Sequence, residues 1–217
     1  MINREEIIKS IEKYKIVVIL RGLTQKQLID VVDAMIKGGI KFVEITFDQS
    51  GKISNETTAD NIRALKNNFS DKAHIGAGTV MTEAQVEIAY KAGAEFIISP
   101  DCDERVIHKT RELGMISIPG AFTPTEVANA YRFGADFVKL FPATSIGPAY
   151  IKAIKAPLSH IKLLAVGGIN ESNMSEYLKA GISGFGVGSC IVNKKMLDQN
   201  DWSGITELSK KYVNALK

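Results

Sequence analysis

A lysine inside an apolar run is the residue of this sequence whose type and setting most directly indicate chemistry. Lys139 lies in the stretch FVKLFP, residues 137–142, which has the composition of a strand buried on both faces. Burial lowers the pKa of an amine, and a neutral amine can attack a carbonyl carbon to form a Schiff base. The alternative is a structural lysine whose ammonium reaches a carboxylate or the end of the strand.

Glu44 is the second candidate for chemistry, within the apolar stretch FVEITF, residues 42–47. Strand alternation places Glu44 on the same face as Phe42 and Thr46. A buried carboxyl group can act as a general acid/base with a raised pKa. The alternative is a structural ion pair with Arg21 or Lys139. We favour catalysis because a buried lysine and a buried glutamate occur in the same chain.

Two glycine-containing stretches, AVGGIN (residues 165–170) and GVGS (residues 186–189), follow the last two apolar runs of the chain. Their backbone N–H groups could hold an anion such as phosphate, with Gly167, Gly168, Gly188 and Ser189 in contact with it. We expect Asn170 to cap the helix that follows the first stretch. The alternative is a pair of tight turns without a ligand.

Two further polar residues follow apolar runs. Arg21 could clamp a carboxylate or a phosphate group, or it could pair with Glu44. Thr79 ends the stretch GAGT, residues 76–79, and could present its hydroxyl and backbone N–H groups to a carboxylate. The alternative for this stretch is an ordinary strand-to-helix turn, with Thr79 or Thr82 as the helix cap.

Eight short apolar runs predict the strands that must position these residues. They are Ile16–Leu20, Phe42–Thr46, His74–Ala77, Phe96–Ser99, Met115–Pro119, Phe137–Leu140, Ile161–Ala165 and Gly184–Val187. Amphipathic stretches between them predict helices, among them Leu28–Lys37, Glu83–Ala92, Glu104–Leu113, Glu126–Phe133, Met174–Ala180 and Ile205–Leu216. Strict alternation of strand and helix indicates an α/β fold with a parallel sheet.

Eight such units within 217 residues match a (β/α)8 TIM barrel, and Met1–Tyr14 would form an extra N-terminal helix that closes its bottom. A doubly wound open sheet is disfavoured because LRGLT, residues 20–24, is not a glycine-rich phosphate loop. No linker or low-complexity segment divides the chain, so residues 1–217 are expected to form a single domain. In a barrel, the candidate residues would converge at the C-terminal ends of the strands.

Composition excludes several classes of function. The chain is 45% hydrophobic and 24% charged, with a formal net charge of +3. This charge is too small and too scattered to indicate nucleic-acid binding. No apolar run approaches the roughly 18 residues of a membrane span, and the N-terminus does not resemble a signal peptide. Two cysteines and three histidines show no metal-ligand spacing, so we expect a cytoplasmic protein without a metal site.

Taken together, the motifs resemble one known family. They are VEITF (43–47), GAGTV (76–80), FIISP (96–100), IPG (118–120), KLFPA (139–143), GP (147–148), VGGI (166–169) and GVGS (186–189). The chain resembles the class I 2-keto-3-deoxy-6-phosphogluconate / 4-hydroxy-2-oxoglutarate (KDPG/KHG) aldolases over nearly its whole length, Ile16–Val192. The resemblance implies a (β/α)8 barrel, commonly a homotrimer, that needs no metal or other cofactor.

The resemblance also implies roles for single residues. Lys139 would form the Schiff base and Glu44 would be the general acid/base. The pyruvate portion of the substrate would be surrounded by Arg21, Thr79, Pro100 and Phe141, and the distal phosphate would be held by Gly167, Gly168, Gly188 and Ser189. Such a lyase would cleave a 2-keto-3-deoxy-6-phospho sugar acid, a small phosphorylated keto acid, to pyruvate and glyceraldehyde 3-phosphate.

Two positions depart from the phosphogluconate-cleaving pattern. Many relatives carry an arginine shortly after the catalytic glutamate, where this chain has Asp48 and Gln49. Many also have threonine before the Gly-Gly pair, where Val166 resembles the phosphogalactonate-specific branch. Two alternatives therefore stay open: cleavage of 4-hydroxy-2-oxoglutarate to pyruvate and glyoxylate, and a barrel that binds a phosphorylated ligand without turnover.

Overall fold

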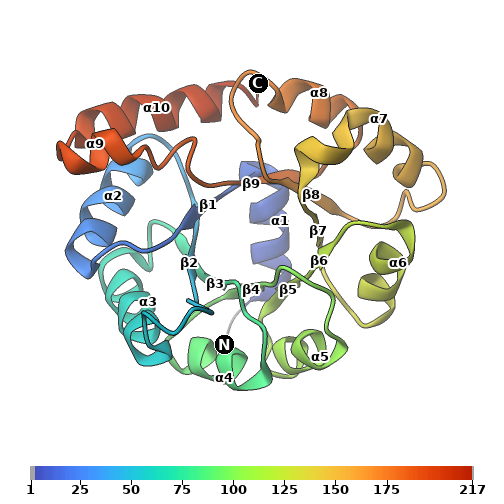
Figure 1. Ribbon diagram of the computed structural model, residues 1–217, viewed down its shortest axis with the longest axis horizontal. Helices are drawn as coiled ribbons and strands as arrows, with labels where there is room; N and C mark the ends of the chain where they lie inside the picture. The colour runs from blue at the N-terminus through green and yellow to red at the C-terminus, as the bar shows by residue number, and fades with distance from the viewer. Residues whose placement is uncertain (1–2, 217) are drawn as a thin grey trace.

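Parallel strands form the centre of the protein. The computed structural model describes residues 3–216, and within them nine strands follow one another in the order β5-β4-β3-β2-β1-β9-β8-β7-β6 (Figure 1). The strands are β1 (Ile16–Leu20), β2 (Phe42–Thr46), β3 (His74–Gly78), β4 (Phe96–Ile98), β5 (Ile116–Ile118), β6 (Gly120–Ala121), β7 (Val138–Leu140), β8 (Leu163–Val166) and β9 (Gly184–Val187). Every strand pairing is parallel, as the alternating pattern predicts.

The two ends of this order are parts of one barrel strand. β5 and β6 are separated only by Pro119, which has no backbone N–H to donate. β5 pairs with β4, and β6 pairs with β7. The carbonyl of Pro119 accepts a 2.8 Å hydrogen bond from the backbone N–H of Lys139. The sheet is therefore a nearly closed barrel, and the (β/α)8 prediction is confirmed with its fifth strand divided in two.

Helices form a ring outside the strands (Figure 1). The ring consists of α2 (Gln25–Lys37), α3 (Asn55–Phe69), α4 (Glu83–Lys91), α5 (Glu104–Glu112), α6 (Pro124–Arg132), α7 (Ala143–Lys155), α8 (Met174–Lys179), α9 (Lys194–Asp198) and α10 (Trp202–Asn214). A further helix, α1 (Arg4–Tyr14), lies inside this ring in the same view. The prediction that Asn170 caps α8 is wrong, because Asn173 holds the N-cap position. Asn170 instead accepts a hydrogen bond from the Ser172 backbone within the loop. No helix of residues 3–216 has the length and apolar character needed to cross a membrane.

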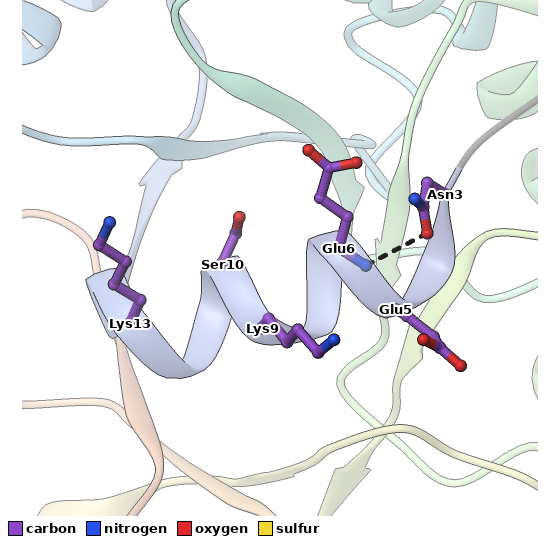
Figure 2. Close-up of a pocket in the computed structure, with 6 residues that line it drawn as sticks. All are labelled: Asn3, Glu5, Glu6, Lys9, Ser10 and Lys13. Atoms are coloured by element: carbon purple, nitrogen blue, oxygen red, sulfur yellow. Dashed lines mark hydrogen bonds between the residues drawn. The ribbon is translucent and has the colours of Figure 1, made fainter.

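The N-terminal helix α1 covers the N-terminal end of the barrel. It begins at Asn3, whose side chain accepts a hydrogen bond from the Glu6 backbone N–H (Figure 2). Its buried residues Ile7 and Ile11 pack against the apolar side chains inside the barrel. Arg4 pairs with the mostly buried Asp136 at 2.6 Å. The predicted closing helix is confirmed from Arg4 onward, and Met1 and Ile2 lie outside the described residues.

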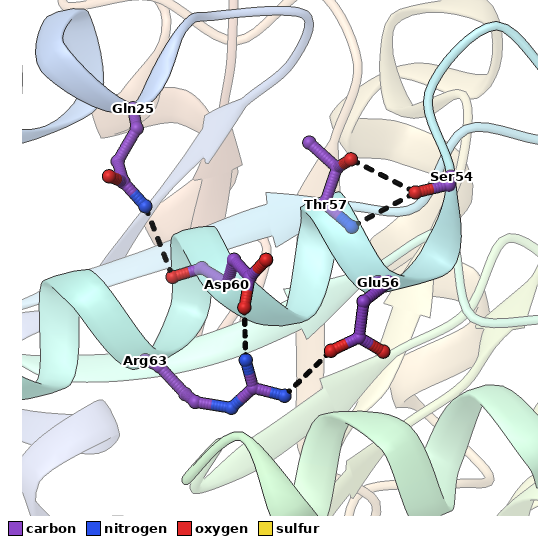
Figure 3. Close-up of polar contacts among 6 residues, drawn as sticks. All are labelled: Gln25, Ser54, Glu56, Thr57, Asp60 and Arg63. Atoms are coloured by element: carbon purple, nitrogen blue, oxygen red, sulfur yellow. Dashed lines mark hydrogen bonds and ion pairs between the residues drawn. The ribbon is translucent and has the colours of Figure 1, made fainter.

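Helix α3 starts at a polar cap and follows the loop after β2. Ser54 accepts a 3.1 Å hydrogen bond from the Thr57 backbone N–H, and Arg63 pairs with Glu56 and Asp60 (Figure 3). Gln25 of α2 donates to the Asp60 carbonyl at 3.4 Å, which joins the two neighbouring helices. The exposed face of α3 is strongly polar, and this explains why its pattern is less evident in the sequence than that of α2.

Alternation along the strands divides the interior of the barrel into layers. Phe42, Phe96 and Phe137 point into the barrel and form an apolar lower layer together with Val17 and Leu164. Residues two positions further along each strand lie on the same inner face and one layer higher. This layer lies toward the C-terminal ends of the strands, at the end opposite to α1, and it contains the residues described next.

Candidate active site

The upper layer of the barrel interior holds a lysine and a glutamate above the apolar side chains. Lys139 is two residues beyond Phe137 on β7, and Glu44 is two residues beyond Phe42 on β2. Their exposed fractions are 8% and 2%. Ordinary charged side chains are almost never this buried without a partner. The fold therefore places both predicted catalytic groups inside one end of the barrel.

The buried carboxyl group of Glu44 is not part of a salt bridge among the described residues. Its Oε2 atom has no hydrogen-bond partner, and the residue forms no salt bridge within residues 3–216. Burial raises the pKa of Glu44 from 4.5 to about 7, although the positive charges of Lys139 and Arg21 oppose this rise. A carboxyl group with a pKa near neutrality can both accept and donate a proton at physiological pH.

Lys139 is held by the strands on both sides. It is in register with Gly120 of β6 and with Leu164 of β8, and its backbone N–H donates to the Pro119 carbonyl. Burial lowers the pKa of the Lys139 amine, Arg21 adds to this effect, and Glu44 opposes it. The lowered pKa raises the fraction of neutral amine, which is the form that attacks a carbonyl carbon.

Arg21 and Thr79 lie together at the mouth of the barrel. An Nη2–H group of Arg21 donates to Oγ1 of Thr79 at 3.2 Å. The alternative in which Arg21 forms an ion pair with Glu44 is not observed, although its charge acts on the carboxyl group. The cap of α4 is Thr82, whose side chain accepts from the Gln85 backbone. Thr79 is thus not a helix cap, and its hydroxyl faces the Arg21 guanidinium.

Phe141 lies beside the lysine, and Pro100 lies beside the strand next to it. The Nζ atom of Lys139 lies 5.0 Å from the centroid of the Phe141 ring, which is 42% exposed. Pro100 follows β4, and its carbonyl group is so close to Gly120 that a β-carbon there would overlap it. Since Gly120 is the register partner of Lys139, Pro100 lies next to β6, the neighbour of the strand that carries the amine. Both residues therefore lie at the end of the barrel that holds Lys139.

The four residues predicted to hold phosphate follow the neighbouring strands β8 and β9. Gly167 accepts a 3.3 Å hydrogen bond from the Thr144 backbone, and a side chain at Gly168 would overlap the side chain of Thr144. Gly188 and Ser189 line a cavity of about 550 Å³ together with Arg21. This cavity extends from Ile19 on the inner face of β1 toward Lys194 on α9. The ten predicted site residues thus all lie at the C-terminal end of the barrel.

The chain and its fold match a known family. The family described as "KDPG and KHG aldolase" matches residues 7–208 of the chain. The chain belongs to this aldolase family. It is therefore an aldolase and a lyase. Within residues 3–216, no group of three or more His, Cys, Asp or Glu residues could hold a metal ion.

Relatives of known name support the assignment. The chain is 37% identical over 178 residues to the 2-dehydro-3-deoxy-6-phosphogalactonate aldolase of Escherichia coli K12, covering 82% of this chain and 84% of the relative. It is 32% identical over 215 residues to the 2-dehydro-3-deoxy-phosphogluconate aldolase of Haemophilus influenzae, covering 98% of each. Both comparisons cover more than four fifths of the chain.

A solved structure from the same aldolase family also matches. It is the KDPG aldolase from Legionella pneumophila with pyruvate captured at low pH as a covalent carbinolamine intermediate. The two chains superpose with a TM-score of 0.84 at 28% sequence identity, covering 94% of this chain and 96% of that one. A carbinolamine is the adduct that an amine and a ketone form before they lose water to give a Schiff base.

Gly78 belongs to the stretch GAGT, and the structure gives it a role beside Glu44 that the sequence does not indicate. A β-carbon at Gly78 would overlap Oε1 of Glu44, whose register partner on β3 is Gly76, two residues before Gly78. The absence of a side chain at Gly78 therefore makes the room that the buried carboxyl group occupies. A glycine at a strand end is common for many reasons, so only the three-dimensional contact assigns this role.

Substituting Gly78→Ala is expected to lower kcat/KM for cleavage by about 10- to 100-fold, because the added methyl group displaces the Glu44 carboxyl group from its position. The same substitution in a Glu44→Ala background should have no further effect on cleavage, since the group that it displaces is gone. Steady-state kinetics of the four proteins measure this coupling. Equal losses in both backgrounds would contradict the proposed contact.

Proposed function

We propose that this aldolase cleaves a 2-keto-3-deoxy-6-phospho sugar acid to pyruvate and glyceraldehyde 3-phosphate through a Schiff base on Lys139. One observation carries the proposal: an amine and a carboxyl group are buried in the same end of the barrel, without a salt bridge, and their pKa values are shifted toward neutrality. Structural ion pairs hold charged groups in their ionised forms, whereas here burial favours the neutral forms.

The reaction starts with the neutral amine. Lys139 attacks the 2-keto carbon, and loss of water from the carbinolamine gives a protonated Schiff base. This cation withdraws electrons from the bond between C3 and C4. Arg21 and Thr79 hold the substrate carboxylate beside the Schiff base, since a guanidinium and a hydroxyl group both donate hydrogen bonds to it. The Phe141 ring and Pro100 complete the wall around the pyruvate portion.

Glu44 then acts as the base. Its carboxylate removes the proton of the C4 hydroxyl group, directly or through a water molecule. The C3–C4 bond breaks, its electron pair moves toward the Schiff base as an enamine, and the aldehyde product leaves. Protonation of the enamine at C3 and hydrolysis release pyruvate and restore the Lys139 amine. Gly167, Gly168, Gly188 and Ser189 hold the distal phosphate throughout.

The pH dependence of cleavage should follow from these shifts. Only the ionised Glu44 can accept the C4 hydroxyl proton, and burial raises its pKa to about 7. Below this pKa the ionised fraction falls tenfold for each pH unit, so kcat/KM should decrease along an acidic limb with a midpoint near pH 7. The neutral fraction of the Lys139 amine also decreases as the pH falls. A rate that stays flat between pH 5 and 7 would contradict the assignment of Glu44 as the base.

A substrate panel tests the proposed function. Pyruvate release is measured with 6-phosphorylated 2-keto-3-deoxy sugar acids, with the same acids lacking phosphate, and with 4-hydroxy-2-oxoglutarate. The phosphorylated acids should have the highest kcat/KM, because the anion subsite contributes only when phosphate is present. Equal or faster cleavage of 4-hydroxy-2-oxoglutarate would favour that substrate instead. Failure to release pyruvate from any of them would favour a binding protein without turnover.

Val166 favours the phosphogalactonate epimer within this panel. Its side chain lies against Gly186 at the end of β8 and is 5% exposed, so it offers an apolar surface where threonine would offer a hydroxyl group. An apolar side chain cannot hydrogen-bond to a substrate hydroxyl and discriminates between epimers by shape alone. The 37% identical relative named for phosphogalactonate is in line with this proposal.

We further propose that residues 1–217 act as one aldolase domain in a cytoplasmic homotrimer. Support for the trimer comes from the family resemblance and from Phe122 and Phe141, two large apolar side chains that are 40% and 42% exposed beside the mouth of the barrel. Cys102 and Cys190 are both free thiols, as is usual in a reducing compartment. A solution mass of 23.7 kDa, rather than three times this value, would contradict the trimer.

A further inference from the structure

Gln49 joins two loops at the mouth of the barrel. It is exposed and lies in the loop between β2 and α3, five residues beyond Glu44. Its Nε2–H group donates to the backbone carbonyl of Thr79 at 2.8 Å. Thr79 belongs to the next loop around the barrel, between β3 and α4. The contact therefore ties the loop after the strand that carries Glu44 to the residue whose hydroxyl faces Arg21.

A second glutamine, Gln85, supports the contact between Gln49 and the Thr79 loop. Gln85 of α4 is 6% exposed, and its Oε1 atom accepts from the Met81 backbone N–H at 2.8 Å. The same oxygen accepts from Gln49 at 3.4 Å, and Nε2 of Gln85 donates to Asn55 at 3.4 Å. Two glutamine side chains thus hold the backbone on either side of Val80. Gln85 is the buried member of this polar network, and a polar network fixes the groups it contacts when its members are satisfied.

Thr79 needs such support because of its backbone conformation. Its φ angle is +55°, in the left-handed region that β-branched residues rarely adopt. The neighbouring Val80 N–H donates to Ile98 at 3.2 Å, which holds the far side of the turn. In this conformation the Thr79 hydroxyl lies 3.2 Å from Nη2 of Arg21. Gln49 holds the Thr79 carbonyl and, through it, the direction of this hydroxyl group.

We propose that Gln49 is a positioning residue that sets the affinity of this aldolase for the carboxylate of its keto acid. The proposal rests on the function proposed above, in which Thr79 and Arg21 bind that carboxylate. Gln49 acts through the Thr79 backbone and not by touching the substrate. Its neighbour Asp48 has a different role, because its carboxylate accepts hydrogen bonds from Ser50 and Ile53 within its own loop.

The substitution Gln49→Ala tests the proposal against Ser50→Ala, a matched control in the same loop. Ser50 is also exposed, but its hydroxyl donates to Asp48 and not to Thr79. Both variants are incubated with increasing pyruvate and borohydride, and covalent labelling of Lys139 is followed by mass spectrometry. Gln49→Ala should raise the pyruvate concentration for half-maximal labelling by about tenfold, the effect of one lost hydrogen bond. Ser50→Ala should leave this concentration unchanged. Maximal labelling and Tm should be the same as in the wild type for both variants.

The isosteric substitution Gln49→Glu adds a readout that a merely structural role would not give. An ionised glutamate cannot donate to the Thr79 carbonyl, but a protonated one can. Pyruvate affinity relative to the wild type at the same pH should therefore be low at pH 7.5 and recover as the pH falls to about 4, where an exposed glutamate becomes protonated. Equal half-maximal concentrations in Gln49→Ala and Ser50→Ala, with normal labelling, would overturn the positioning role alone. Absence of labelling in the wild type would overturn the proposed function as well.

Discussion

Substituting Lys139→Met is expected to abolish cleavage, with kcat reduced on the order of 10⁴-fold or more, as for enzymes that lose their nucleophile. Methionine has nearly the length of the lysine side chain but no amine, so no Schiff base can form. Without it, the electron pair of the C3–C4 bond can move only to the neutral 2-keto group, which is a much poorer acceptor than a protonated Schiff base. Pyruvate release under saturating substrate measures the effect.

The same variant should remain folded. Replacing a buried charge by an apolar side chain of similar volume is often neutral or stabilising, so the Tm should stay the same or rise. Loss of the Lys139 charge removes an attraction that lowers the Glu44 pKa, and the pKa of Glu44 should rise further. Lys152→Met, at an exposed position of α7, is the matched control and should cleave at the wild-type rate. Cleavage by Lys139→Met within tenfold of the wild type would exclude Lys139 as the nucleophile.

Substituting Glu44→Gln should separate Schiff-base formation from bond cleavage. The amide keeps the size of the carboxyl group but cannot accept the C4 hydroxyl proton, so kcat should fall by about 10²- to 10⁴-fold. The attraction of Glu44 raises the pKa of Lys139. Its loss should lower that pKa further and keep the amine neutral, so pyruvate should still be trapped on Lys139.

Two measurements on Glu44→Gln check this expectation. Steady-state kinetics give the loss of cleavage, and borohydride trapping with pyruvate gives the retained adduct. Glu176→Gln, at an exposed position of α8, is the control for a glutamate outside the barrel interior. A Glu44→Gln enzyme that cleaves its substrate at the control rate would show that another group, or water alone, removes the hydroxyl proton.

Most of the barrel follows from local sequence patterns. Runs such as Ile16–Leu20 and Phe42–Thr46 are strands with the predicted bounds, because both are rich in β-branched or aromatic residues and each follows a lysine. Helix α7 is harder to predict, since it contains Pro148 and its residue Gly147 has a non-helical conformation. The division of the fifth strand at Pro119 also depends on pairing with two different neighbours, which a single strand pattern does not contain.

Those site residues that are charged but lie in an apolar stretch could be predicted from the sequence. A lysine or glutamate in an apolar strand is visible as an anomaly, and alternation assigns Glu44 to the inner face. The partners of Arg21 and Gln49 were not predictable, because they depend on how loops from different strands approach one another. From the sequence, the partner of Arg21 could be either Glu44 or an anionic group of the substrate. In the structure, its guanidinium lies beside Thr79.

Reductive trapping of pyruvate on the wild-type aldolase tests the central claim most directly. The protein is incubated with pyruvate and borohydride, digested, and its peptides are mapped by mass spectrometry. The buried position and lowered pKa of the Lys139 amine predict a stable pyruvate adduct on Lys139, which is absent when pyruvate or borohydride is omitted. An unlabelled Lys139 peptide, or an adduct on a different lysine, would contradict the Schiff-base mechanism.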